Sequence, residues 1–173
     1  NLNLLEQIKA EEIRRNNLLR YFSPAVAHEI MEQDSAQPLQ NRRQRLTVLV
    51  ADIRGFSALA EGMRPEEVVT LVNHYLGLIA EEIFAHQGTL DKFIGDAVMA
   101  VFGAPFPAAD DTERAACTAL GIQERLSKER QNQDIPISFG IGISTGEAVV
   151  GNIGTEKRLE YTAIGETVNT AFR

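Results

Sequence analysis

The apolar and polar positions of the chain follow two periods, one typical of strands and one typical of helices. Residues 46–53 (LTVLVADI) form a nearly continuous apolar run, which predicts a central strand covered on both faces. Residues 55–57 are expected to turn the chain, and Pro65 then opens a long helix. The apolar residues of that helix recur three or four positions apart, at Val68, Val72, Tyr75, Ile79 and Ile83. We expect Gly88 to end it as a C-terminal cap.

Residues 89–102 contain two apolar runs on either side of Gly95-Asp96, the residue types of a two-residue hairpin turn. A glycine takes a positive φ without strain, so Asp96 is predicted at the tip of the hairpin. Another helix is expected from about Asp110, with Glu113 in a position that resembles a capping box. Strands are predicted at residues 135–144, 146–153 and 159–164, and a last helix runs from Gly165 to Arg173.

This order of elements predicts an α+β fold. It corresponds to a ferredoxin-like βαββαβ core with a mostly antiparallel sheet, followed by a trailing hairpin and helix. Glycines 140, 142 and 146 interrupt the later strands and indicate close approach of backbone or of a ligand.

The N-terminal part of the chain has a different character. Residues 2–33 are predicted to be helical, with Ser23 capping a new helix start and Pro24 in its first turn. The apolar positions follow a heptad-like seam only loosely, yet such a seam needs a partner. Residues 34–44 are interpreted as a linker, and Arg42, Arg43 and Arg45 as its solvated approach to a strand rather than an anion or membrane patch. We therefore divide the chain into a signalling helix and linker (1–44) and a second domain (45–173).

The composition of the chain argues against several classes of protein. The chain has 173 residues, 44% of them hydrophobic, with a net charge of −7 and a pI of about 5.0, which argues against a general nucleic-acid binder. The single Cys117 excludes an intrachain disulfide and suggests a small buried role in a reducing compartment. No apolar run approaches the ~20 residues of a membrane span, so we expect no membrane segment in this piece and a cytoplasmic location.

Two carboxylates stand out as candidates for chemistry. Asp96 lies on the predicted hairpin turn and Asp52 lies near the end of another apolar strand. Two fixed acids at the ends of neighbouring strands would supply oxygen ligands for a hard divalent cation. His28, His74 and His86 show no metal-ligand spacing and are interpreted as ordinary helix residues.

Four segments, taken together, point to a known family. They are residues 52–57 (DIRGFS), 91–100 (DKFIGDAVMA), 140–146 (GIGISTG) and 161–173 (YTAIGETVNTAFR). In order and spacing they closely resemble the catalytic domain of class III nucleotidyl (adenylate/guanylate) cyclases. The family's further phosphate-binding lysine would follow Arg173, so the domain is expected to be C-terminally incomplete.

The resemblance implies a metal site and a phosphate site. Asp52 and Asp96 match the family's metal-binding aspartates, and the Ile53 carbonyl oxygen would add a ligand for two divalent cations, Mg²⁺ or Mn²⁺. Phe56 and Ser57 match the positions where backbone amides and a hydroxyl hold phosphates. The family usually has Thr at position 57, and Ser keeps the hydroxyl.

The resemblance also implies residues that bind the base and the ribose. Lys92 and Thr162 would recognise the purine, and because adenine N1 accepts a hydrogen bond while guanine N1 carries a proton, a lysine favours ATP. This pair places the chain in the Lys-Thr adenylate cyclase subgroup of bacterial type. Asn169 and Arg173, four positions apart on one predicted helix face, would orient the ribose and stabilise phosphoryl charge. Without the resemblance, Lys92 would be interpreted as a solvated hairpin cation.

In the family, one subunit supplies the aspartates and its partner supplies the base- and ribose-binding residues. This chain carries both sets, which implies a head-to-tail homodimer with shared sites and an inactive monomer. The N-terminal helix would join the domain to an upstream sensory domain in a longer parent chain.

Three other functions are less consistent with the sequence. A guanylate cyclase is disfavoured by Lys92 and Thr162, and a diguanylate cyclase by the absence of its hairpin motif. A catalytically inactive regulatory dimerisation module is disfavoured because the aspartates, Asn169 and Arg173 are all present.

Overall fold

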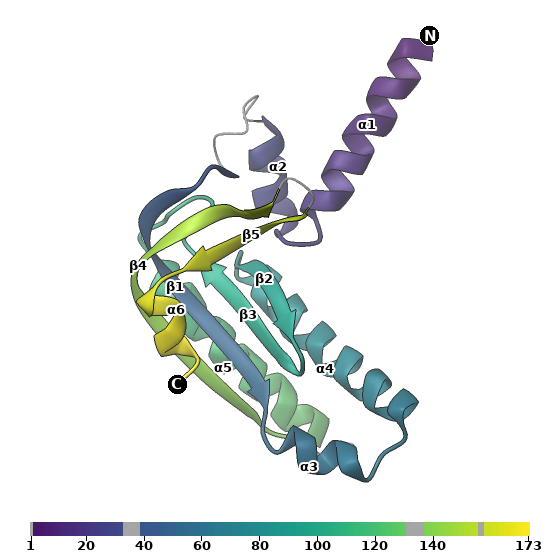
Figure 1. Cartoon of the computed structure of the whole chain (residues 1–173), viewed down its shortest axis with the longest axis vertical. Coiled ribbons are helices and arrows are strands. Elements are labelled where there is room, and N and C mark those ends of the chain that lie inside the picture. Colours follow the sequence, from purple (N-terminus) through teal and green to yellow (C-terminus); the bar gives the residue numbers. More distant parts are fainter. Residues whose placement is uncertain (1, 33–38, 131–136, 156–157) are drawn as a thin grey trace.

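The computed structural model describes residues 2–32, 39–130, 137–155 and 158–173. Within these ranges, antiparallel strands form a sheet in the order β2-β3-β1-β4-β5 (Figure 1). The strands are β1 (Arg42–Ile53), β2 (Thr89–Ile94), β3 (Ala97–Phe102), β4 (Phe139–Thr155) and β5 (Arg158–Ile164). The helices are α1 (Leu2–Leu18), α2 (Pro24–Glu32), α3 (Phe56–Glu61), α4 (Pro65–Ala85), α5 (Asp111–Arg130) and α6 (Glu166–Ala171). The predicted α+β fold with an antiparallel sheet is confirmed.

The middle strand, β1, is buried on both faces. Its residues alternate between two hydrophobic clusters, with Leu49 and Ala51 in one and Val48 and Val50 in the other. Helices α4 and α5 cover the first face, while α2 and α6 contribute to the second (Figure 1). Burial on both faces explains why this strand is apolar at successive positions rather than at alternate ones.

Helix α4 packs its apolar stripe on the sheet, with Tyr75, Ile79 and Ile83 buried as the periodicity predicts. By length and composition α4 would also qualify as a membrane span among the described helices, contrary to the expectation from the sequence. Part of this apolar composition belongs to the core, where Tyr75, Leu76, Ile79 and Ile83 are buried, while Val69 is 58% exposed.

Gly88 takes part in the C-terminal cap of α4, as predicted, because its N–H donates to the Ile83 carbonyl oxygen at 2.8 Å. Helix α4 ends at Ala85, and the residue with left-handed φ is Gln87 (56°). Glycine is required at position 88 for space as well, because a Cβ there would lie 2.8 Å from the buried side chains of Ile83 and Phe102.

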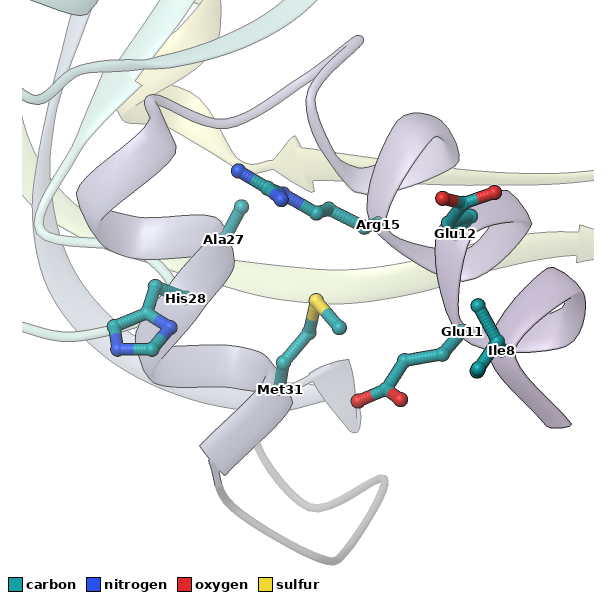
Figure 2. Close-up of a pocket in the computed structure, with 7 residues that line it drawn as sticks. All are labelled: Ile8, Glu11, Glu12, Arg15, Ala27, His28 and Met31. Atoms are coloured by element: carbon teal, nitrogen blue, oxygen red, sulfur yellow. The ribbon is translucent and has the colours of Figure 1, made fainter. Parts of the chain in front are cut away.

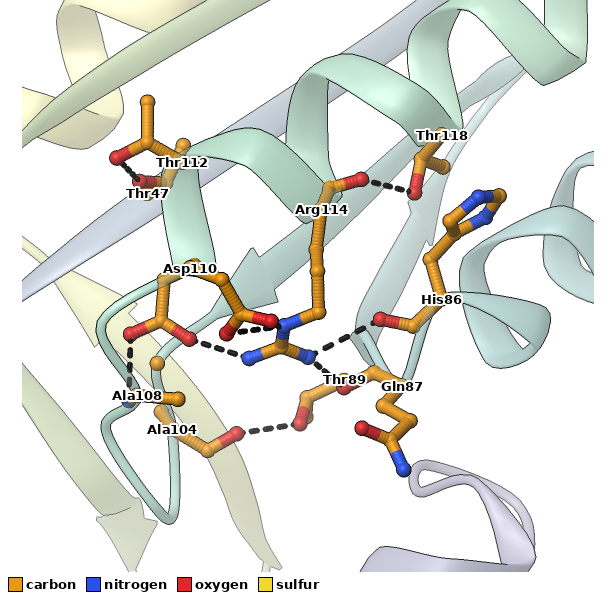
Figure 3. A network of polar contacts seen from close by, with 12 residues as sticks. Thr47, His86, Gln87, Thr89, Ala104, Ala108, Asp110, Thr112, Arg114 and Thr118 are labelled. Atoms are coloured by element: carbon orange, nitrogen blue, oxygen red, sulfur yellow. Dashed lines mark hydrogen bonds and ion pairs between the residues drawn. The ribbon is translucent and has the colours of Figure 1, made fainter.

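The end of α4 is fastened to the start of α5 by Arg114 (Figure 3). The Arg114 guanidinium donates to the carbonyl oxygens of His86 (3.0 Å) and Gln87 (3.1 Å). It also forms ion pairs with Asp110 (3.2 Å) and Asp111. Arginine at this position satisfies carbonyls that follow a helix end and fixes the connection into β2.

Two strand boundaries differ from the predictions. Strand β1 begins at Arg42, inside the predicted linker, because Arg42 pairs with Val150 of the long strand β4. Residues 145–146 do not separate two strands, since β4 runs unbroken past Gly146 and pairs first with β1 and then with β5. Residues 34–38 of the predicted linker and residues 135–136 of the predicted strand lie outside the described residues. The division of the chain at residue 45 stays a prediction.

The edge strands β2 and β5 meet although three strands separate them in the sheet order. The last part of β4, with Gly151 and Gly154 at φ values of 153° and 145°, carries β5 in a curve across the sheet (Figure 1). Lys92 of β2 thereby reaches Glu160 of β5, with 2.8 Å between Nζ and Oε2.

The turn between α1 and α2 is attached to both edge strands. The Leu90 N–H of β2 donates to the Tyr21 carbonyl oxygen at 2.8 Å. The Phe22 ring packs edge-on against Tyr161 of β5, with 5.4 Å between ring centroids. Helix α2 begins at Pro24, as predicted.

Helix α1 projects away from the sheet (Figure 1). Its residues Leu5, Ile8 and Ile13 are 59%, 47% and 62% exposed.

Cys117, predicted to be buried, is exposed on α5, because the buried face of that helix is formed by Ala115, Ile122 and Leu126.

Replacing Gly88 by Ala should lower the free energy of unfolding by about 1–3 kcal/mol, because the added methyl group overpacks a core that cannot expand freely. Gly77→Ala, in the same segment, is the matched control. A Cβ at Gly77 meets nothing within 4 Å, so alanine should stabilise α4 by about 1 kcal/mol. Urea unfolding of both variants checks this, and a neutral Gly88→Ala would contradict the steric account.

Candidate functional site

The two predicted metal-binding aspartates lie close together at one end of the sheet. Asp52 of β1 pairs with Ala97, the residue that follows Asp96 in the hairpin. The Ile53 N–H donates a hydrogen bond to Asp96 Oδ2 at 3.2 Å. Gly95 has the positive φ (61°) expected of the turn. Both carboxylates are half-buried, so two anionic groups remain accessible to a ligand.

These groups fit a hard divalent cation. The donors are carboxylate oxygens and the Ile53 carbonyl oxygen, and Mg²⁺ often takes one or two carboxylates while water and phosphate complete its shell. Within the described ranges there is no cluster of three or more His, Cys, Asp or Glu residues suited to a metal. Arg54 Nε lies 3.8 Å from Asp52 Oδ1 and offsets part of the negative charge. An ion bound here would complete its coordination with water or with the phosphate oxygens of a ligand.

Phe56 and Ser57 are in a helix rather than in the turn that the sequence suggested. Gly55, with φ of 69°, caps the N-terminus of α3, and Phe56 is its first residue. Phe56 packs against the core while Ser57 is exposed. The Ser57 hydroxyl is therefore available to a ligand a few residues beyond Asp52.

A cavity of about 180 Å³ connects the aspartate region to the end of α6. Its lining includes Asp52, Arg54, Gly140, Gly142 and Arg173. A Cβ at Gly142 would collide with the Ala171 carbonyl oxygen, and one at Gly140 with the Arg54 guanidinium. The close approach predicted at these glycines is confirmed, and it lets α6 lie against β4.

Asn169 and Arg173 do not share a helix face. Asn169 is exposed within α6, whereas α6 ends at Ala171 and Arg173 lies beyond it. Arg173 forms an ion pair with Glu166 at 3.7 Å. The structure thus places Arg173 at the same cavity as Asp52 of its own chain, while Asn169 is not part of that lining.

The predicted base-recognising pair, Lys92 and Thr162, comes together around a third residue. Asp91 Oδ2 accepts hydrogen bonds from Thr162 Oγ1 (2.6 Å) and from the Ala163 N–H (3.3 Å). Lys92 Nζ lies 3.6 Å from Asp91 Oδ1 and 2.8 Å from Glu160 Oε2. Partial burial lowers the pKa of Lys92, but the hydrogen bonds and negative charges of Glu160 and Asp91 raise it by more. The pKa of Lys92 is therefore raised above its ordinary value. The side chain therefore remains a cation.

Asp91 and Glu160 were not predicted from the sequence to contribute to the site. Asp91 is 5% exposed, and burial raises the pKa of its carboxyl despite the donors around it. The β2–β3 register shifts between Leu90 and Lys92, a bulge that turns Asp91 inward. The available signal was an aspartate inside an otherwise apolar strand. Glu160 gave no such signal, because only the curve of β5 brings it to Lys92.

A second cavity, of about 440 Å³, lies between α1 and α2 and contains none of the predicted site residues (Figure 2). It is lined by Ile8, Glu11, Glu12, Arg15, Ala27, His28 and Met31. His28 pairs with Glu32 at 3.2 Å, and His74 and His86 also pair with glutamates.

Residues 39–173 match the family model of the adenylate and guanylate cyclase catalytic domain. The chain is 42% identical over 135 residues to adenylate cyclase 1 of Rhizobium meliloti, which covers 76% of this chain and 20% of that protein. It is 38% identical over 170 residues to an uncharacterised protein of Mycobacterium tuberculosis, covering 98% of this chain and 29% of the relative. The chain thus spans less than a third of the length of these relatives.

Solved structures of both activities are similar to this chain. The guanylyl cyclase Cya2 has a TM-score of 0.72 and 43% identity, covering 76% of this chain and 69% of its own. The adenylyl cyclase CyaB from P. aeruginosa has a TM-score of 0.74 and 37% identity, covering 78% and 72%. A bacterial light-regulated adenylyl cyclase has a TM-score of 0.78 and 29% identity, covering 98% of this chain and 48% of its own.

Asp91→Asn should change how stability depends on pH. Because burial raises the pKa of Asp91 in the folded chain, the folded state holds this proton more tightly than the unfolded state, and the contribution of Asp91 to stability falls as pH rises above about 4. Urea unfolding between about pH 4.5 and pH 7 measures this. The stability of wild type relative to Asp91→Asn should decrease as pH rises, and a constant difference would contradict the raised pKa.

Proposed function

The chain belongs to the class III family of adenylate and guanylate cyclase catalytic domains, and from this premise we propose that it is an adenylate cyclase. In that reaction the ribose 3′-oxygen of ATP bonds to the α-phosphorus, the bond to pyrophosphate breaks, and 3′,5′-cyclic AMP forms. The observation that carries the choice of ATP is the Lys92 ammonium beside Thr162. Lysine donates to adenine N1, whereas guanine N1 presents a hydrogen to it. This pair also supports membership of the Lys-Thr subgroup.

Class III cyclases use two metal ions, and we assign their binding to Asp52, Asp96 and the Ile53 carbonyl oxygen, with Mg²⁺ or Mn²⁺ as the ion. When bound, such ions neutralise triphosphate charge and lower the pKa of the attacking hydroxyl. Phe56 and Ser57, at the start of α3, hold the phosphates through backbone N–H groups and the Ser57 hydroxyl. Their place just after Asp52 in the chain supports this assignment.

Class III cyclases bind nucleotide and function as dimers. We assign Asn169 and Arg173 to the site of the partner subunit, where they orient the ribose and stabilise charge on the α-phosphoryl group. Lys92 and Thr162 bind the base in that same site. Since Arg173 lies at the cavity of Asp52 in its own chain, the competing arrangement is a site completed within one subunit, and the mixing experiment below separates the two.

The homologues are longer proteins, and we propose that α1 and α2 connect the domain to an upstream sensory domain. The exposed Leu5 and Ile8 on α1 suit pairing with the same helix of a second copy. The contacts of Tyr21 and Phe22 with β2 and β5 would carry a change in that pairing to the base-binding strands. A cytoplasmic location belongs to the same proposal.

A guanylate cyclase is the second candidate, because the guanylyl cyclase Cya2 shares 43% identity with this chain. Assays of the full-length protein with ATP and GTP side by side, in Mg²⁺ and in Mn²⁺, decide between them. We expect cyclic AMP from ATP as the main product. Preferred use of GTP would favour the second candidate, and absence of any cyclic product would indicate an inactive regulatory module.

Mixing two inactive variants should restore activity if the sites are shared. Asp52→Ala and Asn169→Ala should each lower kcat by about 100-fold or more. In a random mixture half of the dimers contain both chains, and each has one intact site, so about a quarter of wild-type activity should return. No recovery after subunit exchange would show that each site is completed within one chain. Asp52→Ala mixed with itself is the control.

A further inference from the structure

The hydrogen bond between Thr162 and Asp91 fixes what the Thr162 hydroxyl can do. A threonine hydroxyl has one hydrogen to donate and lone pairs to accept with, so a free one can face either a donor or an acceptor. Here Thr162 Oγ1 donates its hydrogen to Asp91 Oδ2 at 2.6 Å. With that hydrogen used, the oxygen can meet a ligand only as an acceptor.

Asp91 is held in this orientation by its surroundings. The bulge in β2 turns it away from solvent, and its side chain is 1% exposed. The Ala163 N–H donates to the same oxygen as Thr162, at 3.3 Å. Lys92 lies on the other side of the carboxylate, 3.6 Å from Oδ1. The carboxylate cannot turn away from Thr162 without leaving a buried N–H unpaired.

Adenine and guanine differ at the two positions that such a pair would face. The 6-amino group of adenine donates and its N1 accepts, whereas the 6-oxo group of guanine accepts and its N1 carries a hydrogen. Lys92 can only donate, and Thr162 bound to Asp91 can only accept. Lys92 and Thr162 can therefore form hydrogen bonds with adenine at both positions. With a 6-oxopurine, a donor would face a donor at N1 and an acceptor would face an acceptor at position 6.

We propose that Asp91 is a specificity-determining positioning residue, which makes Thr162 an obligatory acceptor for the 6-amino group of ATP; this inference rests on the proposed adenylate cyclase function. Asp91 does not touch the base. It acts by removing the donor capacity of Thr162, so that a hydroxyl discriminates between purines as a carboxylate would. The alternative is that Asp91 merely ties β2 to β5.

The test compares kcat/KM for ATP and for inosine triphosphate in the full-length protein at about pH 8, well above the ordinary carboxyl pKa. Inosine triphosphate carries the 6-oxo group and the N1 hydrogen without other changes to the ring edge. Asp91→Ala frees the Thr162 hydrogen, so the ATP preference should fall by about tenfold. In a Thr162→Ala background, Asp91→Ala should leave the preference unchanged, because no hydroxyl remains to be oriented.

A role confined to tying the strands would lower kcat/KM for both substrates equally, and an unchanged preference in Asp91→Ala would overturn the inference. If wild type makes no cyclic AMP or prefers the 6-oxopurine, the proposed function itself fails.

If circular dichroism shows that Asp91→Ala does not fold, the variants Thr162→Ser and Thr162→Val are compared instead. Thr162→Ser keeps the hydroxyl and should keep the ATP preference. Thr162→Val should lose it, and retention in Thr162→Val would overturn the inference.

Discussion

The pairing of β1 with β3 on one side and β4 on the other positions the candidate metal site. Because β1 is the middle strand, Asp52 emerges beside the hairpin turn that carries Asp96 and across from Gly140 of β4. The alternation of β1 between two hydrophobic clusters fixes this register, since a shift by one residue would move Leu49 and Val50 to the wrong faces. The core therefore enforces the geometry of the carboxylates.

Structural features that depend on residues close together in the chain could be predicted from the sequence. The Gly95-Asp96 turn, the apolar stripe of α4 and the start of α2 at Pro24 depend on residues within a few positions, and each occurs as expected. The resemblance to a family placed the site residues in roles that no local pattern could assign. It did not settle the choice between adenylate and guanylate cyclase, because solved structures of both activities are similar to this chain.

Features that depend on distant packing were missed. The sequence indicated that Gly88 caps α4, but not that the space beside Phe102 also requires a glycine there. Asp91 contacts Thr162 because β5 curves over to β2, and a sequence does not reveal that two edge strands will meet. The burial of Cys117 was wrong for a related reason, since the face of α5 that packs is set by the sheet below it.

The contacts of Tyr21 and Phe22 show that the folded unit extends beyond the residues matched by the family model. The family match begins at residue 39, yet Phe22, Ala27 and Ile30 are among the most buried side chains of the second cluster. A chain trimmed to the matched region would expose an apolar surface around Tyr161 and an unpaired Leu90 N–H on an edge strand, which are the conditions for aggregation. We therefore expect the solubility of the matched domain to depend on residues that precede it in the chain.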